Sequence, residues 1–173
     1  RGGGGAQKQK RNKGRLGGQV TVLEDLRSLG REGMRGSRKR ECGVVSNKNV
    51  ATFIKEFVVK LPAGEHLNFR SGGYIQIDIP KYNIDYKDMD IEEPYRTDWE
   101  KMGVFKLHAH NSEPTFKAYS MANHPAEGDI IMLNVRIATP PFDKAKGGFM
   151  NVPPGLSPSY IFPRHPVDKA LIS

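Results

Sequence analysis

Cysteine is almost missing from this sequence, which has only Cys42 among its 173 residues. One cysteine excludes an intrachain disulfide, and it excludes four-cysteine zinc and iron–sulfur sites within one chain. Of the five histidines, His108 and His110 lie two residues apart, which on a strand places them on one face. Two ligands do not make a metal site, so a solvated polar stretch is the simpler interpretation of this pair.

Long apolar runs are also missing. No run approaches the roughly 18 residues that a transmembrane helix needs, and the N-terminus has no apolar signal sequence. We therefore expect a chain that is soluble by itself. It begins at Arg1 without a methionine, which suggests a fragment of a longer protein.

Acidic residues are scarce relative to basic ones at the N-terminal end of the chain only. Residues 1–42 hold 12 basic and 4 acidic side chains, which accounts for the whole net charge of +8. The remaining residues carry equal numbers of each sign, so they offer no electrostatic reason to bind a nucleic acid.

Two N-terminal segments differ from the rest of the chain in their residue composition and in the spacing of their apolar residues. Residues 1–19, "RGGGGAQKQKRNKGRLGGQ", are rich in glycine and basic residues, and we expect them to be disordered. Residues 20–35 carry apolar side chains at roughly helical spacing, which predicts a short amphipathic helix.

From Glu41 onward, the pattern predicts strands. "ECGVVS" and "ATFIKEFVVKLP" are rich in β-branched and aromatic residues, with a turn expected at "NKN" between them. "YIQIDI" and "IIMLNVRI" alternate apolar and polar residues, as half-buried strands do. Residues 81–115 are polar and acidic, which suggests a long excursion outside the core. Residues 139–154 read as a loop, and a helix is expected to begin after Gly155 and Ser157. Several short strands with little helix favour a mainly β fold, an antiparallel β-barrel or sandwich.

The string "KAYSMAN", residues 117–123, brings together a cation, an aromatic ring and a hydroxyl. Period-two alternation puts Lys117 and Tyr119 on one face of a strand and Ser120 on the other, unless a bulge re-aims one of them. Together they suit a flat, phosphorylated cofactor, because a ring can stack, a cation can meet phosphate and a hydroxyl can reach a ring nitrogen. The alternative is an ordinary strand end with a surface lysine.

Longer stretches strengthen the first interpretation. "FRSGGYIQIDIPKYNIDYKDMDI", "KAYSMAN", "IMLNVRIATPP" and "SYIF" together resemble the F subunits of Na⁺-translocating NADH:quinone oxidoreductases, a family within the ferredoxin–NADP⁺ reductase superfamily. The resemblance extends from about residue 41 to residue 173. It implies an antiparallel β-barrel of the FAD-binding type over residues 41–173, and a degenerate ferredoxin-like remnant over residues 1–40.

The resemblance also implies roles for particular residues. In the family's Arg-x-Tyr-Ser motif, the Arg contacts the FAD phosphates, the Tyr packs on the isoalloxazine ring and the Ser bonds the flavin edge. Here Tyr119 and Ser120 match, and Lys117 replaces the arginine, which keeps the charge but loses the bidentate fork. "LNVRIAT" resembles the family's stretch that runs along the cofactor after this motif, which implies contacts with FAD from Asn134, Val135 and Arg136.

A second phosphate site of the family, Gly-x-x-Ser at a helix start, falls on "GLSP". Gly155 matches, but Pro158 stands where the serine belongs and supplies neither a hydroxyl nor an N–H. Ser157 and Ser159 flank Pro158, and we expect one of them to substitute.

The parts of the family that surround the flavin domain are changed or missing. The family's 2Fe–2S cluster loop resembles "RGGGGAQKQKRNK", where non-thiolate residues replace the ligands, so no cluster is expected. The replaced positions are Arg1, Gln7, Lys10 and Ser37. No dinucleotide-binding fingerprint is present, so NADH would bind only through a domain that this chain lacks.

Three functions remain open on the sequence alone. The first is the FAD-binding part of an NADH:quinone oxidoreductase coupled to sodium transport, with the other subunits of that membrane complex as partners. The family works at the cytoplasmic face of the bacterial inner membrane, and the isolated chain is expected to be inactive. The second is a truncated, non-catalytic interaction module of the same complex. The third is a nucleic-acid binder acting through its basic tail, although that tail has no aromatic residue to stack on bases.

Overall fold

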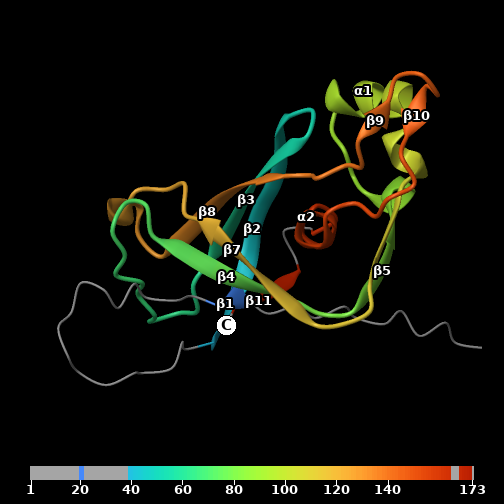
Figure 1. Cartoon of the computed structure of the whole chain (residues 1–173). Helices are drawn as coiled ribbons and strands as arrows, with labels where there is room; N and C mark the ends of the chain where they lie inside the picture. The colour runs from blue at the N-terminus through green and yellow to red at the C-terminus, as the bar shows by residue number, and fades with distance from the viewer. Residues whose placement is uncertain (1–19, 22–38, 165–167, 173) are drawn as a thin grey trace, which may run out of the picture.

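The computed structural model describes residues 20–21, 39–164 and 168–172 (Figure 1). The disorder expected for residues 1–19 and most of the helix expected over 20–35 lie outside these ranges. So do four replaced cluster positions, Arg1, Gln7, Lys10 and Ser37. Where the predicted helix would begin, Val20–Thr21 instead form strand β1, which pairs with both β2 and β4. In the described part of the chain, no helix is long and apolar enough to cross a bilayer.

Antiparallel pairing builds the larger sheet, which has seven strands in the order β7-β4-β1-β2-β3-β8, with β11 beside β2. Its strands besides β1 are β2 (Lys39–Ala51), β3 (Ile54–Lys60), β4 (Tyr74–Ile79), β7 (Thr115–Ser120), β8 (Ile130–Arg136) and β11 (Lys169–Ile172). The prediction of a mainly β protein with antiparallel strands is therefore confirmed.

The two ends of this sheet, β7 and β8, come together at a single point. Just beyond β7, the Ala122 N–H donates to the Met132 carbonyl oxygen at 2.7 Å. The Asn123 side chain extends the contact, donating to the Ile130 oxygen and accepting from the Met132 N–H. Between β7 and β8 themselves, the described residues form no strand ladder, so no closed barrel is detected in this part of the chain.

Alternating apolar residues make the core, as the sequence predicted. On β4, Ile75, Ile77 and Ile79 are buried, and on β8 the same holds for Ile131, Leu133 and Val135. Cys42 is a buried residue of β2, where loss of solvation raises the pKa of its thiol to about 12. It therefore behaves as a small apolar strand residue.

The prediction of a turn at Asn47-Lys48-Asn49 is wrong. These residues continue β2, and the chain reverses only at Thr52 and Phe53. Asn47 is buried, and its side-chain nitrogen donates to the carbonyl oxygens of Ile161, Phe162 and Arg164. Asparagine normally favours turns because its amide competes for backbone groups, and here it satisfies the backbone of a distant segment instead.

The interpretation of residues 81–115 as an excursion outside the core is also wrong. This segment, which we call the insertion, contains β5 (Tyr82–Asp85), η2 (Tyr86–Asp88), α1 (Tyr95–Met102), η3 (Val104–Lys106) and β6 (His108–Asn111). Tyr86 and Trp99 are both 0% exposed, and the Trp99 ring lies 5.9 Å from that of Phe162, centroid to centroid. A few large aromatic side chains thus bury a segment whose average composition is polar.

Helix α2 (Leu156–Ile161) occupies the centre of the molecule. Figure 1 shows it between the large sheet and the lobe that contains β5 and α1, and it contacts β4, β5, β6 and β8. The predicted helix is present but begins earlier than expected, at Leu156 directly after its N-cap Gly155, so Ser157 lies within it rather than before it. The short elements η4 (Pro125–Glu127), β9 (Phe142–Asp143) and β10 (Gly148–Phe149) complete the described fold.

Candidate functional site

Strand β7 carries the first group of predicted site residues. In its pairing with β4, Lys117 lies opposite Ile77 and Tyr119 opposite Ile75. Because cross-strand partners share a face, Lys117 and Tyr119 lie on the core-facing side of the sheet, as the alternation predicted. Lys117 is nevertheless exposed, whereas Tyr119 is half-buried.

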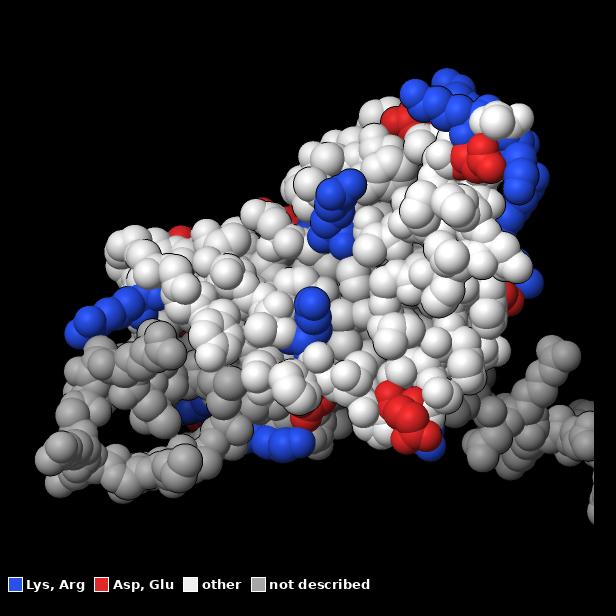
Figure 2. All heavy atoms as spheres, in the orientation of Figure 1, with Lys and Arg blue, Asp and Glu red and all other residues white. Residues whose placement is uncertain are grey.

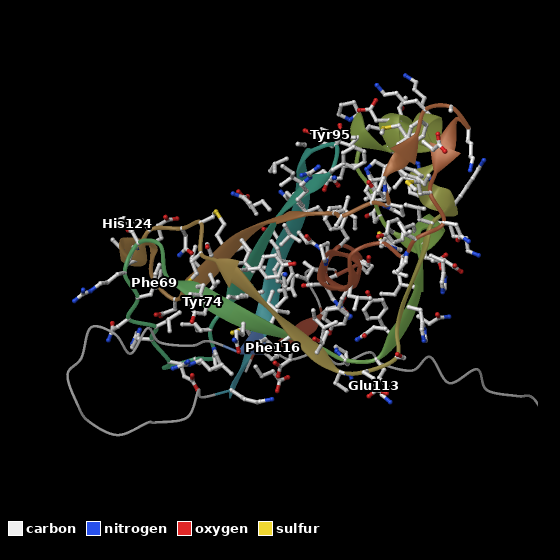
Figure 3. All side chains as sticks on the ribbon, viewed as in Figure 1. Phe69, Tyr74, Tyr95, Glu113, Phe116 and His124 are labelled. Atoms are coloured by element: carbon white, nitrogen blue, oxygen red, sulfur yellow. The ribbon has the colours of Figure 1, made fainter. Side chains whose placement is uncertain are left out.

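Ser120 projects from the opposite face, beside its cross-strand partner Tyr74. Figure 3 shows the side chains of Tyr74 and Phe116 on these two strands, and both are exposed. Among the described strands, β7 pairs only with β4, so its other edge is open. The side chains of Tyr119 and Ser120 lie on opposite faces of β7, so a ligand that contacts both would have to pass around this unpaired edge or the end of the strand.

A hydrogen bond joins β7 to α2. The Tyr119 hydroxyl lies 2.8 Å from the Ser157 Oγ, so the two predicted motifs meet directly although these residues are 38 positions apart in the sequence. Burial raises the pKa of the Tyr119 hydroxyl, and the Ser157 hydrogen bond opposes that shift in part. The contact fixes where the tyrosine ring stands relative to the start of the helix.

Gly155 allows the chain to approach the segment that follows β8 closely before α2 begins. Its N–H donates to the Ala138 carbonyl oxygen at 2.8 Å. A Cβ atom at Gly155 would lie 2.6 Å from the Ala138 Cβ, which is closer than two non-bonded carbon atoms can approach. The glycine is thus required here for space, since its φ of −62° suits any residue.

Ser159 of α2 points inward, whereas Leu156 is exposed and Pro158 is partly buried. Ser159 is fully buried; its Oγ donates to the Gly155 carbonyl oxygen and lies 2.7 Å from the Tyr86 hydroxyl. Pro158 occupies the first turn, where its carbonyl oxygen accepts from the Phe162 N–H. Both serines that flank Pro158, one of which was expected to replace the family's phosphate-binding serine, are therefore engaged with tyrosines in this structure.

The predicted residues of β8 divide by face. Asn134 and Arg136 are exposed, and Val135 between them is completely buried. Neither Arg136 nor Lys117 forms an ion pair with any carboxylate in the described ranges. Figure 2 shows separate basic side chains on a largely uncharged surface over β7 and α2. Lys117, two residues from Tyr119 on the same strand, and Arg136 of β8 are exposed cations, and cations together with an aromatic ring are the kinds of group that a phosphorylated, planar ligand requires.

Sequence reasoning missed the residues that hold α2 from the inside. Tyr82 and Tyr86 of the insertion and Asn47 of β2 each bond to the helix or its end. The only available signal was the number of aromatic residues in a segment that was otherwise polar. Nothing local distinguished Asn47 from a turn residue.

The paired histidines make polar contacts on the surface. His108 and His110 both lie within hydrogen-bonding distance of the Asn83 Oδ1, and His108 also contacts Asp85 at 2.7 Å. The His108 contact lowers the pKa of the Asp85 carboxyl. Within the described ranges, no group of three or more metal-binding side chains gathers at one place.

Comparison with known proteins finds close relatives with one shared description. The chain is 52% identical over 159 residues to the F subunit of the Na⁺-translocating NADH-quinone reductase of Methylococcus capsulatus. It is 50% identical to that of Idiomarina loihiensis and 48% identical to that of Alteromonas macleodii. Each alignment covers 92% of this chain, but only 38%, 38% and 51% of the respective relatives. The chain thus spans about half of their length or less. No protein-family model matches it.

Proposed function

Because the chain is homologous to the F subunits of the Na⁺-translocating NADH-quinone reductases, we propose that residues 41–173 are the FAD-binding part of such an enzyme. In this proposal the domain is an antiparallel β-barrel of the ferredoxin-reductase type whose described strands leave it open between β7 and β8, and residues 1–40 are a degenerate ferredoxin-like remnant. The observation that carries the proposal is the Tyr119–Ser157 contact, which brings together the two stretches that resemble the family's flavin motifs.

The open edge of β7 is the place where the cofactor would lie. There the Tyr119 ring would pack on the isoalloxazine, and the Ser120 hydroxyl would bond the flavin edge from the other side of the strand. The exposed Lys117 and Arg136 would contact phosphate oxygens, with Asn134 beside them. Val135 is buried, so its side chain would support the site from within.

The residues of this chain would bind the FAD, orient it and exclude water from it. When bound, FAD supplies the hydride and electron chemistry, which in the whole enzyme would pass electrons from NADH towards quinone. Tyr119 excludes water from one face of the ring, and Ser120 offers a hydrogen bond that tunes the flavin edge. Other subunits of the membrane complex would be the partners, at the cytoplasmic face of the inner membrane.

Replacing Tyr119 by alanine tests the site most directly. We expect the affinity for FAD to fall about tenfold or more, since burial and stacking of an aromatic ring contribute roughly 1–3 kcal/mol. A flavin-fluorescence titration measures the change. Tyr95→Ala is the matched control, because Tyr95 is also a half-buried tyrosine but lies far from β7 (Figure 3). Unchanged FAD binding in Tyr119→Ala would contradict the proposal, and a parent chain that binds no FAD would favour the non-catalytic interaction module.

Lys117→Arg is expected to act in the opposite direction. A guanidinium can hold phosphate with two parallel hydrogen bonds, so FAD should bind about three- to tenfold more tightly. The same substitution at Lys144, an exposed lysine of the β9–β10 hairpin, should leave the titration unchanged. Weaker or equal binding in Lys117→Arg would show that this side chain does not contact the phosphates.

A further inference from the structure

Three tyrosine hydroxyls converge on the first four residues of α2. Tyr82 donates to the Leu156 carbonyl oxygen at 2.5 Å, and Tyr119 contacts the Ser157 Oγ at 2.8 Å. Tyr86 completes the set, 2.7 Å from the Ser159 Oγ. Tyr82 and Tyr86 come from the insertion, whereas Tyr119 comes from β7.

Helix geometry explains why the two serines serve different partners. Residues two apart on an α-helix are separated by about 200°, so Ser157 and Ser159 point to nearly opposite sides of α2. Ser157 therefore reaches β7 and Ser159 reaches the insertion. The start of the helix is held between them by side chains from two distant parts of the chain.

Burial makes these contacts costly to lose. Ser157 is 4% exposed and Ser159 and Tyr86 are 0% exposed, so a hydroxyl without its partner would remain unsatisfied inside the protein. Burial also raises the pKa values of Tyr82 and Tyr86 to about 12, so both hydroxyls remain protonated donors even at pH values well above the physiological range.

We propose that Ser157 and Ser159 are positioning residues rather than phosphate ligands, and that the insertion sets the orientation of the Tyr119 ring through α2. The inference rests on the proposed FAD site, because the ring that it positions is the one that would pack on the flavin. The order of contacts is Tyr86 to Ser159, then along the helix to Ser157, then to Tyr119.

A direct phosphate role for these serines would require the network to break. Each Oγ already lies at hydrogen-bonding distance from a tyrosine oxygen, and Ser159 also donates to the Gly155 carbonyl oxygen. The exposed cations of β7 and β8 need no such rearrangement to meet phosphate. The network therefore leaves phosphate binding to Lys117 and Arg136.

The experiment compares Tyr86→Phe, Tyr119→Phe and their double variant with Tyr95→Phe, all in the full chain. Each substitution removes only a hydroxyl, and among the described residues the Tyr95 hydroxyl has no hydrogen-bond partner. Amide hydrogen exchange of Ser159 and Phe162 in the FAD-free chain reports the hold on α2. FAD affinity and the fluorescence quenching of bound FAD report the orientation of the Tyr119 ring.

Tyr86→Phe should speed exchange of the α2 amides about tenfold and leave bound FAD two- to threefold more fluorescent, although Tyr86 would touch no flavin atom. Because both hydroxyls act on one helix, their effects on FAD affinity should be non-additive: about fivefold for each single variant and less than tenfold together. A purely structural role would lower thermal stability without changing the emission of bound FAD. Tyr95→Phe should change neither measurement.

The outcomes separate this inference from the proposed function. If the α2 amides respond but no variant, nor the parent, binds FAD, the network stands as a structural feature, and its link to a flavin fails with the proposed function. If FAD binds and Tyr86→Phe changes neither α2 exchange nor bound-flavin fluorescence, the network is overturned while the flavin site survives. Should Tyr86→Phe not fold, Ser159→Ala makes the same test from the helix side, with the same expected and contrary results.

Discussion

Replacing Trp99 by alanine is expected to lower the free energy of unfolding by roughly 3–5 kcal/mol, as for other large aromatic residues in protein cores. Trp99 is completely buried, and its ring packs near those of Phe53, Tyr86, Phe105 and Phe162. Its indole N–H donates to the Thr52 carbonyl oxygen in the turn between β2 and β3. Truncation would leave a large cavity between the insertion, α2 and that turn, together with an unsatisfied carbonyl group.

Urea denaturation followed by circular dichroism measures this loss, and Lys101→Ala is the matched control. Lys101 is an exposed residue of the same helix, where a change to alanine should alter stability by less than about 0.5 kcal/mol. Trp99→Phe should fall between the two, because it keeps a ring but loses the indole hydrogen bond. If Trp99→Ala were as stable as the control, the insertion would not be part of the core.

The Trp99 variant bears directly on what the sequence could predict. The strands with strict alternation, "YIQIDI" and "IIMLNVRI", were predicted correctly because each position reports its own burial through period two. The burial of the insertion was not predicted, because it depends on a few aromatic residues among many polar ones. Averaged over the segment, composition hides Trp99, Tyr86 and Val104, and only tertiary packing shows where they go.

Asn47 illustrates the same limit at a single position. An asparagine beside a lysine and another asparagine is typical of a turn. In the structure it lies within β2 and satisfies three carbonyl oxygens at the end of α2, more than 100 residues later. No local pattern carries that information, since the partner groups are backbone atoms of a distant segment.

The candidate site was more accessible to sequence than the insertion was. The facing of Lys117, Tyr119 and Ser120 follows from alternation alone, and the structure places them accordingly. The motif at Gly155 came from resemblance, and only the fold shows that Tyr119 meets Ser157. That a serine beside Pro158 would bond a tyrosine, rather than face solvent, depends on which side of α2 meets β7.

Gly155→Ala is expected to destabilise the fold by about 1–3 kcal/mol, the usual cost of forcing an extra methyl group into a filled space. The new Cβ would lie 2.6 Å from the Ala138 Cβ, so the start of α2 and the segment just after β8 would have to separate. That movement would strain the hydrogen bond from the Gly155 N–H to the Ala138 carbonyl oxygen. It would also carry Ser157 away from Tyr119, so FAD affinity should fall with stability.

The cause of that loss can be isolated by removing the other methyl group. Ala138→Gly in the Gly155→Ala background should recover half or more of the stability and of the FAD affinity, because it relieves the contact directly. Gly148→Ala is the control, since a Cβ there would meet nothing within 4 Å and its φ is not in the left-handed region. A Gly155→Ala chain that melts with the parent, or one that Ala138→Gly does not rescue, would show that α2 tolerates displacement here. The close approach of Gly155 to Ala138 would then not be what holds Ser157 against the Tyr119 hydroxyl.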